Sequence, residues 1–288
     1  MSDAPKGDRR AADRGEGDRR GKARPVGFEA VPRRHSQDHA SFEPVLVFDD
    51  VWKAFGNNVI YEGLNLEVMR GEVLTIVGGS GTGKSVLLKC LLGLLHPDKG
   101  HIHAFGEEVT GRTEAEMLPI RKRVGMLFQG AALFDSMSVG ENVAWPLTAR
   151  GWTDEARIAA KVEEVLTLVD LAGLQRQMPA DLSGGMRKRV GLARTLAMDP
   201  EVILYDEPTT GLDPGNIKMI DQLVVDLQEI TGVTSIIVTH DMESAFRVSD
   251  RIAVLWNRHI EWVGYQDEII GAENPIVRNF VAGNVGHG

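Results

Sequence analysis

A glycine-rich run that directly follows a short apolar stretch constrains this chain more than any other feature. The run, Gly78–Ser85, has the spacing GxxxxGKS, and it follows Val73–Val77, which is expected to form a buried strand. Residues Val86–Leu95 are expected to form the next helix. In that context the backbone N–H groups of the run point into one concavity that holds phosphate oxygens, and the helix N-terminus adds partial positive charge. The sequence therefore predicts a phosphate-binding loop in an α/β fold.

Two residues at the end of this loop carry its side-chain chemistry. Lys84 is expected to reach the β- and γ-phosphates of a nucleotide, and the Ser85 hydroxyl is expected to ligate Mg²⁺. The rest of the loop would approach the phosphates closely through its backbone and consists of Gly78, Gly79, Ser80, Gly81, Thr82 and Gly83. Such a loop alone is compatible with kinases, GTPases, helicases and transport ATPases, so other motifs must decide between these classes.

A second buried strand ends in two adjacent carboxylates. Val202–Tyr205 is apolar throughout, and Asp206 and Glu207 follow it directly. Asp206 is expected to hold the magnesium through its water shell. Glu207 stands one residue further, where a carboxylate can polarise an attacking water as a general base. Beside Lys84, this pair indicates hydrolysis of ATP.

Two polar residues at the ends of further strands complete the predicted site. Gln129 follows the apolar segment Val124–Phe128 and is a candidate Mg²⁺ ligand that also positions water. His240 follows the strand-like segment Ser235–Thr239, where an imidazole could contact the γ-phosphate and orient Glu207. A lone glutamine or histidine at a strand end is more often structural, but the order and spacing of these two around the other motifs favour a catalytic role.

A short turn of serine and glycine precedes a predicted helix. Together with the motifs above, it completes a pattern found in a known family. The turn lies in Leu182-Ser-Gly-Gly-Met186, a second anion site of the helix N-terminal kind. With the motifs above and Gly211-Leu-Asp213, the chain resembles the ATP-binding cassette (ABC) ATPases over roughly Pro44–Gly264. The resemblance implies a P-loop NTPase cassette with a mixed β-sheet core, a helical subdomain at about residues 130–182, and a C-terminal extension over residues 265–288.

The family resemblance also implies that two copies of the chain share their nucleotides. In that family ATP is sandwiched between two cassettes, so Ser183, Gly184 and Gly185 would contact the γ-phosphate bound to the other copy, and Asp213 would lie at the seam. Phe55 matches the aromatic residue that stacks on adenine. Met186 stands where the family usually has glutamine, but the serine and both glycines are present.

The segment between Gln129 and the Ser-Gly-Gly turn would touch a membrane permease in this family. It contains a predicted helix, which Thr153 can cap. The helix has one apolar face that is expected to be internal core, made of Ile158, Val162, Val165, Leu166 and Val169. Upstream, Phe134, Met137 and Trp145 alternate with polar residues. They fit either a groove for the permease or the core, and the sequence leaves both open.

Three short stretches narrow the resemblance. Phe128–Ser136, Leu182–Arg189 and Asn274–Phe280 look like the ATPase subunits of the Mla and Mce phospholipid transport systems. This likeness implies phospholipid transport between inner and outer membranes, with an integral membrane permease and a lipid-binding subunit, at the cytoplasmic face of the inner membrane. An ATPase of a small-solute importer is an alternative. A soluble cassette of translation or DNA repair is less favoured, because the chain has one phosphate-binding loop and no sustained heptads.

Charge distribution limits the remaining partners. The formal net charge of −9 is the wrong sign for a protein that grips nucleic acid through its overall field, so no nucleic-acid partner is expected. Residues 1–43 are expected to be a disordered charged tail, since the first 40 hold ten basic and seven acidic residues with little to bury. The tail is either a solvated linker or attracted to anionic lipid headgroups. No apolar run approaches the roughly 20 residues of a membrane-spanning helix.

Overall fold

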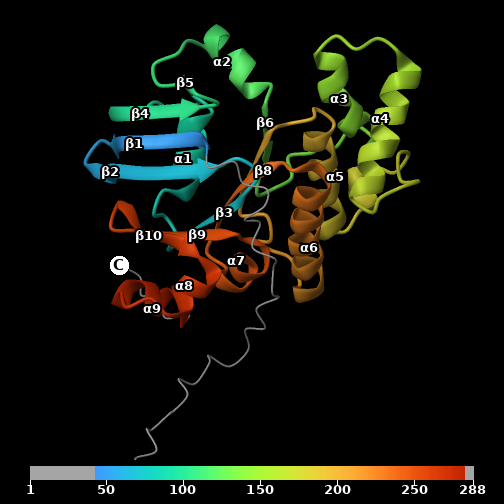
Figure 1. Ribbon diagram of the computed structural model, residues 1–288. Coiled ribbons are helices and arrows are strands. Elements are labelled where there is room, and N and C mark those ends of the chain that lie inside the picture. The colour runs from blue at the N-terminus through green and yellow to red at the C-terminus, as the bar shows by residue number, and fades with distance from the viewer. Residues whose placement is uncertain (1–42, 283–288) are drawn as a thin grey trace, which may run out of the picture.

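The computed structural model describes residues 43–282, so the predicted charged tail lies outside the described residues except for its last position. Two sheets form its framework (Figure 1). In the four-stranded sheet, each strand pairs antiparallel with the next in the order β2-β1-β4-β5. The bounds of these strands are Asn58–Met69, Pro44–Phe55, Lys99–Ala104 and Glu107–Glu108. The six-stranded sheet has the order β10-β9-β3-β8-β7-β6, with bounds His259–Tyr265, Arg251–Trp256, Val73–Val77, Thr234–Thr239, Val202–Asp206 and Val124–Leu127.

The six-stranded sheet is parallel from β6 to β9 and gains one antiparallel edge strand, β10. Its central strands β3, β7 and β8 are buried along almost their whole length, as their continuous apolar sequences predict for a sheet covered on both faces. The predicted α/β fold with a mixed sheet is confirmed. Because the strands are parallel, their carboxyl ends meet at one edge, where the predicted site residues follow β3, β7 and β8.

Helix α1 (Lys84–Leu91) lies between the two sheets. Its Leu87, Leu88 and Leu91 are fully buried in a cluster that includes Phe48 of the antiparallel sheet and Leu204 of the parallel one. The helix ends four residues earlier than the predicted Leu95. Gly93 adopts a left-handed φ of 64°, and the Leu94 N–H bonds back to the Lys89 carbonyl, so the apolar run continues past the end of the helix.

Four helices pack together on the other side of the parallel sheet, at the right of Figure 1. They are α3 (Val139–Ala149), α4 (Glu155–Leu168), α5 (Gly184–Leu196) and α6 (Pro214–Thr231). The predicted apolar face of α4 is core, with Val162, Val165, Leu166 and Val169 buried and Ile158 partly buried. The predicted cap is wrong by one residue: Asp154, and not Thr153, accepts the Arg157 N–H and begins the helix.

Four further α-helices lie elsewhere in the described part of the chain. Helix α2 (Glu114–Arg121) precedes β6, and α7 (Met242–Val248) follows β8. In the predicted C-terminal extension, α8 (Gln266–Ile270) and α9 (Pro275–Val281) pack against the parallel sheet, where the rings of Phe280 and Trp256 meet edge-on at 5.7 Å between centroids. Within residues 43–282, no helix combines the length and the apolar composition that crossing a membrane requires.

Candidate nucleotide site

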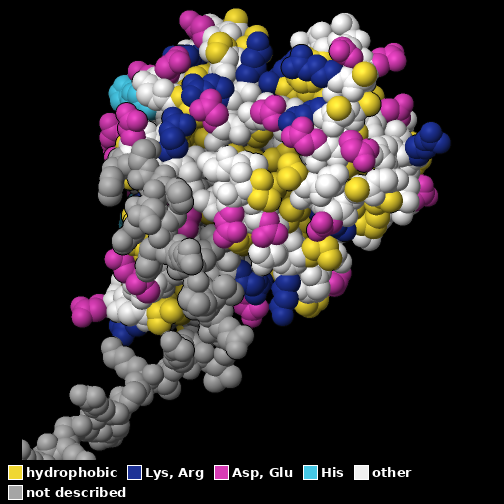
Figure 2. Space-filling view, turned by 45° about the vertical axis from the view of Figure 1, so that its right-hand side comes forward, with side chains coloured by type: hydrophobic (Ala, Val, Ile, Leu, Met, Phe, Trp, Pro, Cys, Tyr) yellow, Lys and Arg dark blue, Asp and Glu magenta, His cyan; other side chains and the backbone are white. Residues whose placement is uncertain are grey.

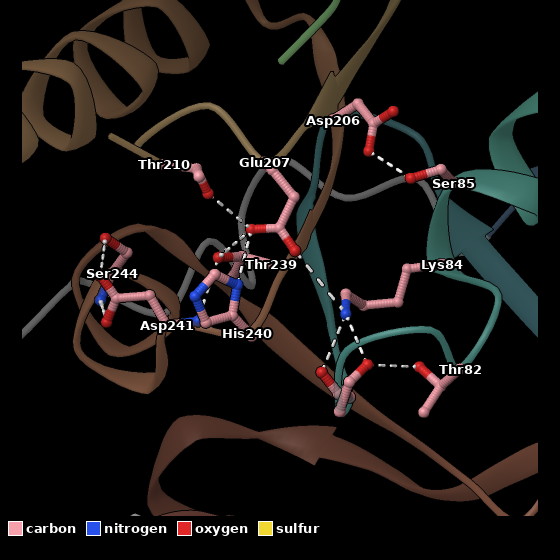
Figure 3. A network of polar contacts seen from close by, with 12 residues as sticks. Thr82, Lys84, Ser85, Asp206, Glu207, Thr210, Thr239, His240, Asp241 and Ser244 are labelled. Carbon is pink, nitrogen blue, oxygen red and sulfur yellow. Dashed lines mark hydrogen bonds and ion pairs between the residues drawn. The ribbon is translucent and has the colours of Figure 1, made fainter. Parts of the chain in front are cut away.

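The phosphate-binding loop is closed by the side chain at its end. Lys84 is the first residue of α1, and its Nζ donates to the carbonyls of Gly78 at 2.9 Å and Gly79 at 3.0 Å. Thr82 Oγ1 also donates to the Gly79 carbonyl, at 2.9 Å (Figure 3). Lys84 is only 6% exposed. Burial lowers the pKa of this ammonium, and the nearby carboxylate of Glu207 opposes the shift.

The backbone of the loop depends on close contacts that only glycine allows. Gly83 has a φ of 103°, and a Cβ there would stand 2.4 Å from Cγ2 of Ile60. The Gly83 carbonyl accepts a hydrogen bond of 2.5 Å from the hydroxyl of Tyr61, which is fully buried. Sequence reasoning missed Tyr61, because no motif marks a tyrosine on a neighbouring strand as the support of this loop.

Ser85 and Asp206 lie together at the carboxyl edge of the sheet. Ser85 Oγ donates to Asp206 Oδ1 at 2.6 Å, although the two residues are far apart in sequence. A hydroxyl and a carboxylate are hard oxygen donors of the kind that Mg²⁺ takes when phosphates and water complete its shell. Residues 43–282 contain no group of three or more metal-ligating side chains that could hold an ion without such help. The donor set therefore fits magnesium bound together with a nucleotide.

Glu207 lies in the centre of the polar network in Figure 3. Its Oε1 is 3.6 Å from Lys84 Nζ, and its Oε2 accepts from Thr210 Oγ1 at 3.0 Å. The same Oε2 is 2.9 Å from His240 Nδ1. The structure thus brings the predicted lysine, glutamate and histidine together, and adds Thr210, which sequence reasoning missed.

The backbone of Glu207 is held in an unusual conformation. Its φ of 49° lies in the left-handed region, which costs a residue other than glycine about 1–3 kcal/mol. The Glu207 N–H donates to the Val238 carbonyl of β8 at 3.0 Å, and the Glu207 carbonyl accepts from the Thr210 N–H at 3.3 Å. The sharp turn directs the carboxylate back toward Lys84 and His240 instead of along the strand.

A buried network lies behind His240. The next residue, Asp241, caps α7, and its Oδ2 accepts from Ser244 Oγ at 3.0 Å. Ser244 Oγ also lies 3.0 Å from Oδ2 of Asp221 on α6, which in turn accepts from Arg247 Nε at 2.7 Å. Asp221 is 3% exposed, and this burial raises the pKa of its carboxyl. Hydrogen bonds through Ser244 therefore connect the turn that carries His240 to α6.

Comparison with known proteins agrees with this geometry. The family model described as "ABC transporter" matches residues 61–210. The probable ribonucleotide transport ATP-binding protein mkl of Mycobacterium leprae is 41% identical over 231 residues, covering 80% of this chain and 67% of the relative. The chain belongs to the ABC transporter family. It is an ATP-hydrolysing cassette of that family.

Two further similarities extend the comparison of this ABC cassette. The chloroplastic protein trigalactosyldiacylglycerol 3 of Arabidopsis thaliana is 39% identical over 252 residues, covering 82% of this chain and 73% of that protein. The dimeric cassette MJ0796, solved in a post-hydrolysis state with ADP and Pi, has a TM-score of 0.69 and 31% identity, covering 76% of this chain and 98% of that one. The match to the mycobacterial mkl proteins spans about two thirds of their length, 64–67%.

Two predicted site residues of the ABC cassette are exposed. Gln129 is exposed, two residues beyond β6, and β6 pairs with the β7 strand that carries Asp206. Phe55 is 45% exposed at the end of β1. Lys53 Nζ lies 5.2 Å from the centroid of the Phe55 ring and is itself held by Asp98 at 3.0 Å. The ring is accessible to a stacking base.

Among residues 43–282, the Ser-Gly-Gly turn of the cassette makes no hydrogen bond to Lys84 or Glu207. Ser183, Gly184 and Gly185, here called the signature turn, begin α5, where Ser183 Oγ accepts the Met186 N–H at 3.2 Å. Asp213 similarly caps α6 by accepting from the Gly215 and Asn216 N–H groups. A Cβ on Gly185 would stand 2.3 Å from Asn216 Oδ1, so the signature turn packs against the start of α6.

Proposed function

We propose that this ABC cassette is the ATP-hydrolysing subunit of a transporter that moves phospholipid between the inner and outer membranes, together with a membrane permease. The observation that carries the catalytic part is the Glu207 carboxylate, held between Lys84 and His240 at the carboxyl edge of the sheet. The lipid substrate is supported by the glycolipid in the name of the Arabidopsis relative and by the three stretches that resemble Mla and Mce ATPases.

In the proposed reaction Glu207 acts as the general base. It takes a proton from the water that attacks the γ-phosphorus, while ADP leaves with the electron pair of the broken P–O bond. His240 and Thr210 fix one carboxylate oxygen, so that the other faces the lysine of the phosphate loop. Mg²⁺, held by Ser85, Gln129 and Asp206, would neutralise charge on the phosphate oxygens.

The second half of each site is proposed to come from another copy of the chain. The signature turn and Asp213 hydrogen-bond to the ends of their own helices and, among residues 43–282, make no hydrogen bond to Lys84, Asp206 or Glu207. A helix N-terminus opened by serine and two glycines suits a γ-phosphate bound to the partner. The dimeric form of the MJ0796 cassette supports this arrangement.

The permease is proposed to dock on an aromatic surface formed by Phe134 and Trp145. Their rings meet at 5.2 Å between centroids, and the residues are 40% and 44% exposed. Phe134 and Trp145 are therefore not part of the core. Met137 is partly buried. Paired exposed aromatics are enriched at protein interfaces because they bury much area at low entropic cost.

The surface charge supports proteins and lipids over nucleic acid as partners. Acidic and basic side chains are interspersed over the face drawn in Figure 2, with small hydrophobic clusters between them. A nucleic-acid grip needs a continuous basic surface. The net charge of −9 also disfavours such a grip, and the face drawn in Figure 2 has no continuous basic surface.

The test is reconstitution with the permease that copurifies with the full chain. In vesicles of phosphatidylethanolamine and phosphatidylglycerol, we expect ATP-dependent transfer of labelled phospholipid to acceptor vesicles, and no transfer with Glu207→Gln. The name of the mkl relative favours one alternative, a small-solute importer. ATP-dependent uptake of ribonucleotides without lipid transfer would establish that alternative and refute the lipid proposal.

A further inference from the structure

Lys188 lies one turn into α5, four residues after Gly184 of the signature turn. Its side chain points into the protein and is 6% exposed. Its Nζ donates to the backbone carbonyl of Glu207 at 3.3 Å. Lys188 therefore connects the helix of the signature turn to the residue proposed as the general base.

Burying a lysine at this position costs free energy. The ammonium loses its hydration, and burial lowers its pKa, a shift that Glu207 and Asp206 oppose by their charges. A methionine would fill a similar volume without that desolvation. Lysine here is thus better explained by its hydrogen bond and charge than by packing.

The carbonyl that Lys188 contacts belongs to the strained residue of the site. Glu207 has a left-handed φ of 49°, and its carbonyl also accepts from the Thr210 N–H at 3.3 Å. Strained conformations persist only where the surroundings hold them. Lys188 supplies the part of that support that comes from α5.

We infer that Lys188 is a positioning residue that holds the backbone of Glu207 and transmits contact at the signature turn to this base. The inference rests on the proposed function, in which the signature turn binds the nucleotide of the partner copy. Because α5 is one rigid element from Gly184 to Lys188, a shift of the turn moves the lysine with it. Each site thereby senses whether the other copy's nucleotide is engaged.

The first experiment compares three variants of the full chain. Lys188→Met removes the donor and keeps the volume; we expect kcat to fall about tenfold or more, with the dissociation constant for Mg–ADP unchanged within about twofold. Lys188→Gln restores an uncharged donor and should recover most of the rate. Lys89→Met, an exposed lysine on α1, is the control and should match the parent.

The second experiment tests transmission with a double-mutant cycle. If Lys188 relays contact made at Ser183, the losses in kcat caused by Ser183→Ala and Lys188→Met should not multiply. The double variant should then have the kcat of the slower of the two single variants. A product of the two separate losses would overturn the relay.

Failure of the inference differs from failure of the proposed function. A parent protein without ATP turnover would remove the function. Turnover in the parent, with Lys188→Met within twofold of it, would remove only the role of Lys188. Equal losses in the methionine and glutamine variants, accompanied by a large fall in melting temperature, would show that Lys188 is structural and would also overturn the inference.

Discussion

The side chains of the nucleotide site are buried and have partners within the chain, whereas those of the aromatic surface are exposed. In the site, Lys84 and Glu207 have side chains only 6% and 14% exposed, and each has polar partners within the chain. On the aromatic surface, Phe134 and Trp145 leave large apolar rings in solvent. The chain alone organises the cluster around Glu207, whereas the aromatic surface is left incomplete. The predictions below test this difference, from the largest expected effect to the smallest.

Replacing the base tests whether the buried cluster performs the reaction. Glu207→Gln keeps the shape and the hydrogen bond from Thr210 but cannot take a proton, so turnover should drop about 10²-fold or more while ATP binding is retained. Phosphate release and binding of a fluorescent ATP analogue measure the two quantities. Turnover within a factor of about three of the parent would move the base role to another residue.

Mixed dimers test whether the cluster is only half of the site. Lys84→Ala and Ser183→Arg homodimers should both be inactive. An equal mixture should recover up to about a quarter of the parent rate, because half of the dimers are mixed and each holds one of two sites intact. Phosphate release before and after mixing is the measurement. An active Ser183→Arg homodimer would exclude the signature turn from the chemistry.

Truncating Asp221 tests how much the buried polar network next to His240 contributes to stability. Asp221→Ala leaves Arg247 with only the more distant carboxylate of Glu243, and because that guanidinium is partly exposed we expect a loss of about 2–3 kcal/mol in the free energy of unfolding. Chemical denaturation measures the loss. Glu229→Ala, an exposed position on the same helix, is the control. Equal stability of the two variants would contradict the prediction.

The pH dependence of stability tests the same carboxyl in another way. Burial raises the pKa of Asp221 above its ordinary 3.8, so the folded state binds this proton more tightly than the unfolded chain. The contribution of the group to stability therefore falls as pH rises through the window between 3.8 and the raised pKa of the folded state. Asp221→Asn removes this titration, and its free energy of unfolding minus that of the parent should increase across the window. A constant difference would contradict the raised pKa.

Truncation on the aromatic surface should have the smallest effect on the isolated chain. Trp145→Ala should keep the melting temperature within a few degrees and leave nucleotide binding intact, while copurification with the permease falls. Val143→Ala on the same helix removes a fully buried side chain and should cost about 1–2 kcal/mol. A fall in melting temperature for Trp145→Ala that exceeds the fall for Val143→Ala would show that the tryptophan is structural.

Most of the site could be predicted because its residues stand at the ends of apolar strands. The Gly78–Ser85 run, Asp206 with Glu207, and His240 each follow a strand that is evident from its sequence. Parallel strands bring their carboxyl ends to one edge, so order along the chain translates into proximity. Tyr61, Thr210 and Lys188 belong to no such pattern, and their contacts with Gly83 and Glu207 arise from packing between distant segments.

The sequence by itself determined the phosphate loop, because glycine spacing and the apolar strand before it are local properties of the chain, and the cassette fold followed from the resemblance of its ordered motifs to a known family. Only the tertiary structure decided whether Phe134 and Trp145 are core or surface, since an apolar residue does not encode what will cover it. Only the tertiary structure placed a buried lysine of α5 against the strained backbone of Glu207. Burial and long-range contact depend on how the elements pack, and that packing is decided by all of the chain at once.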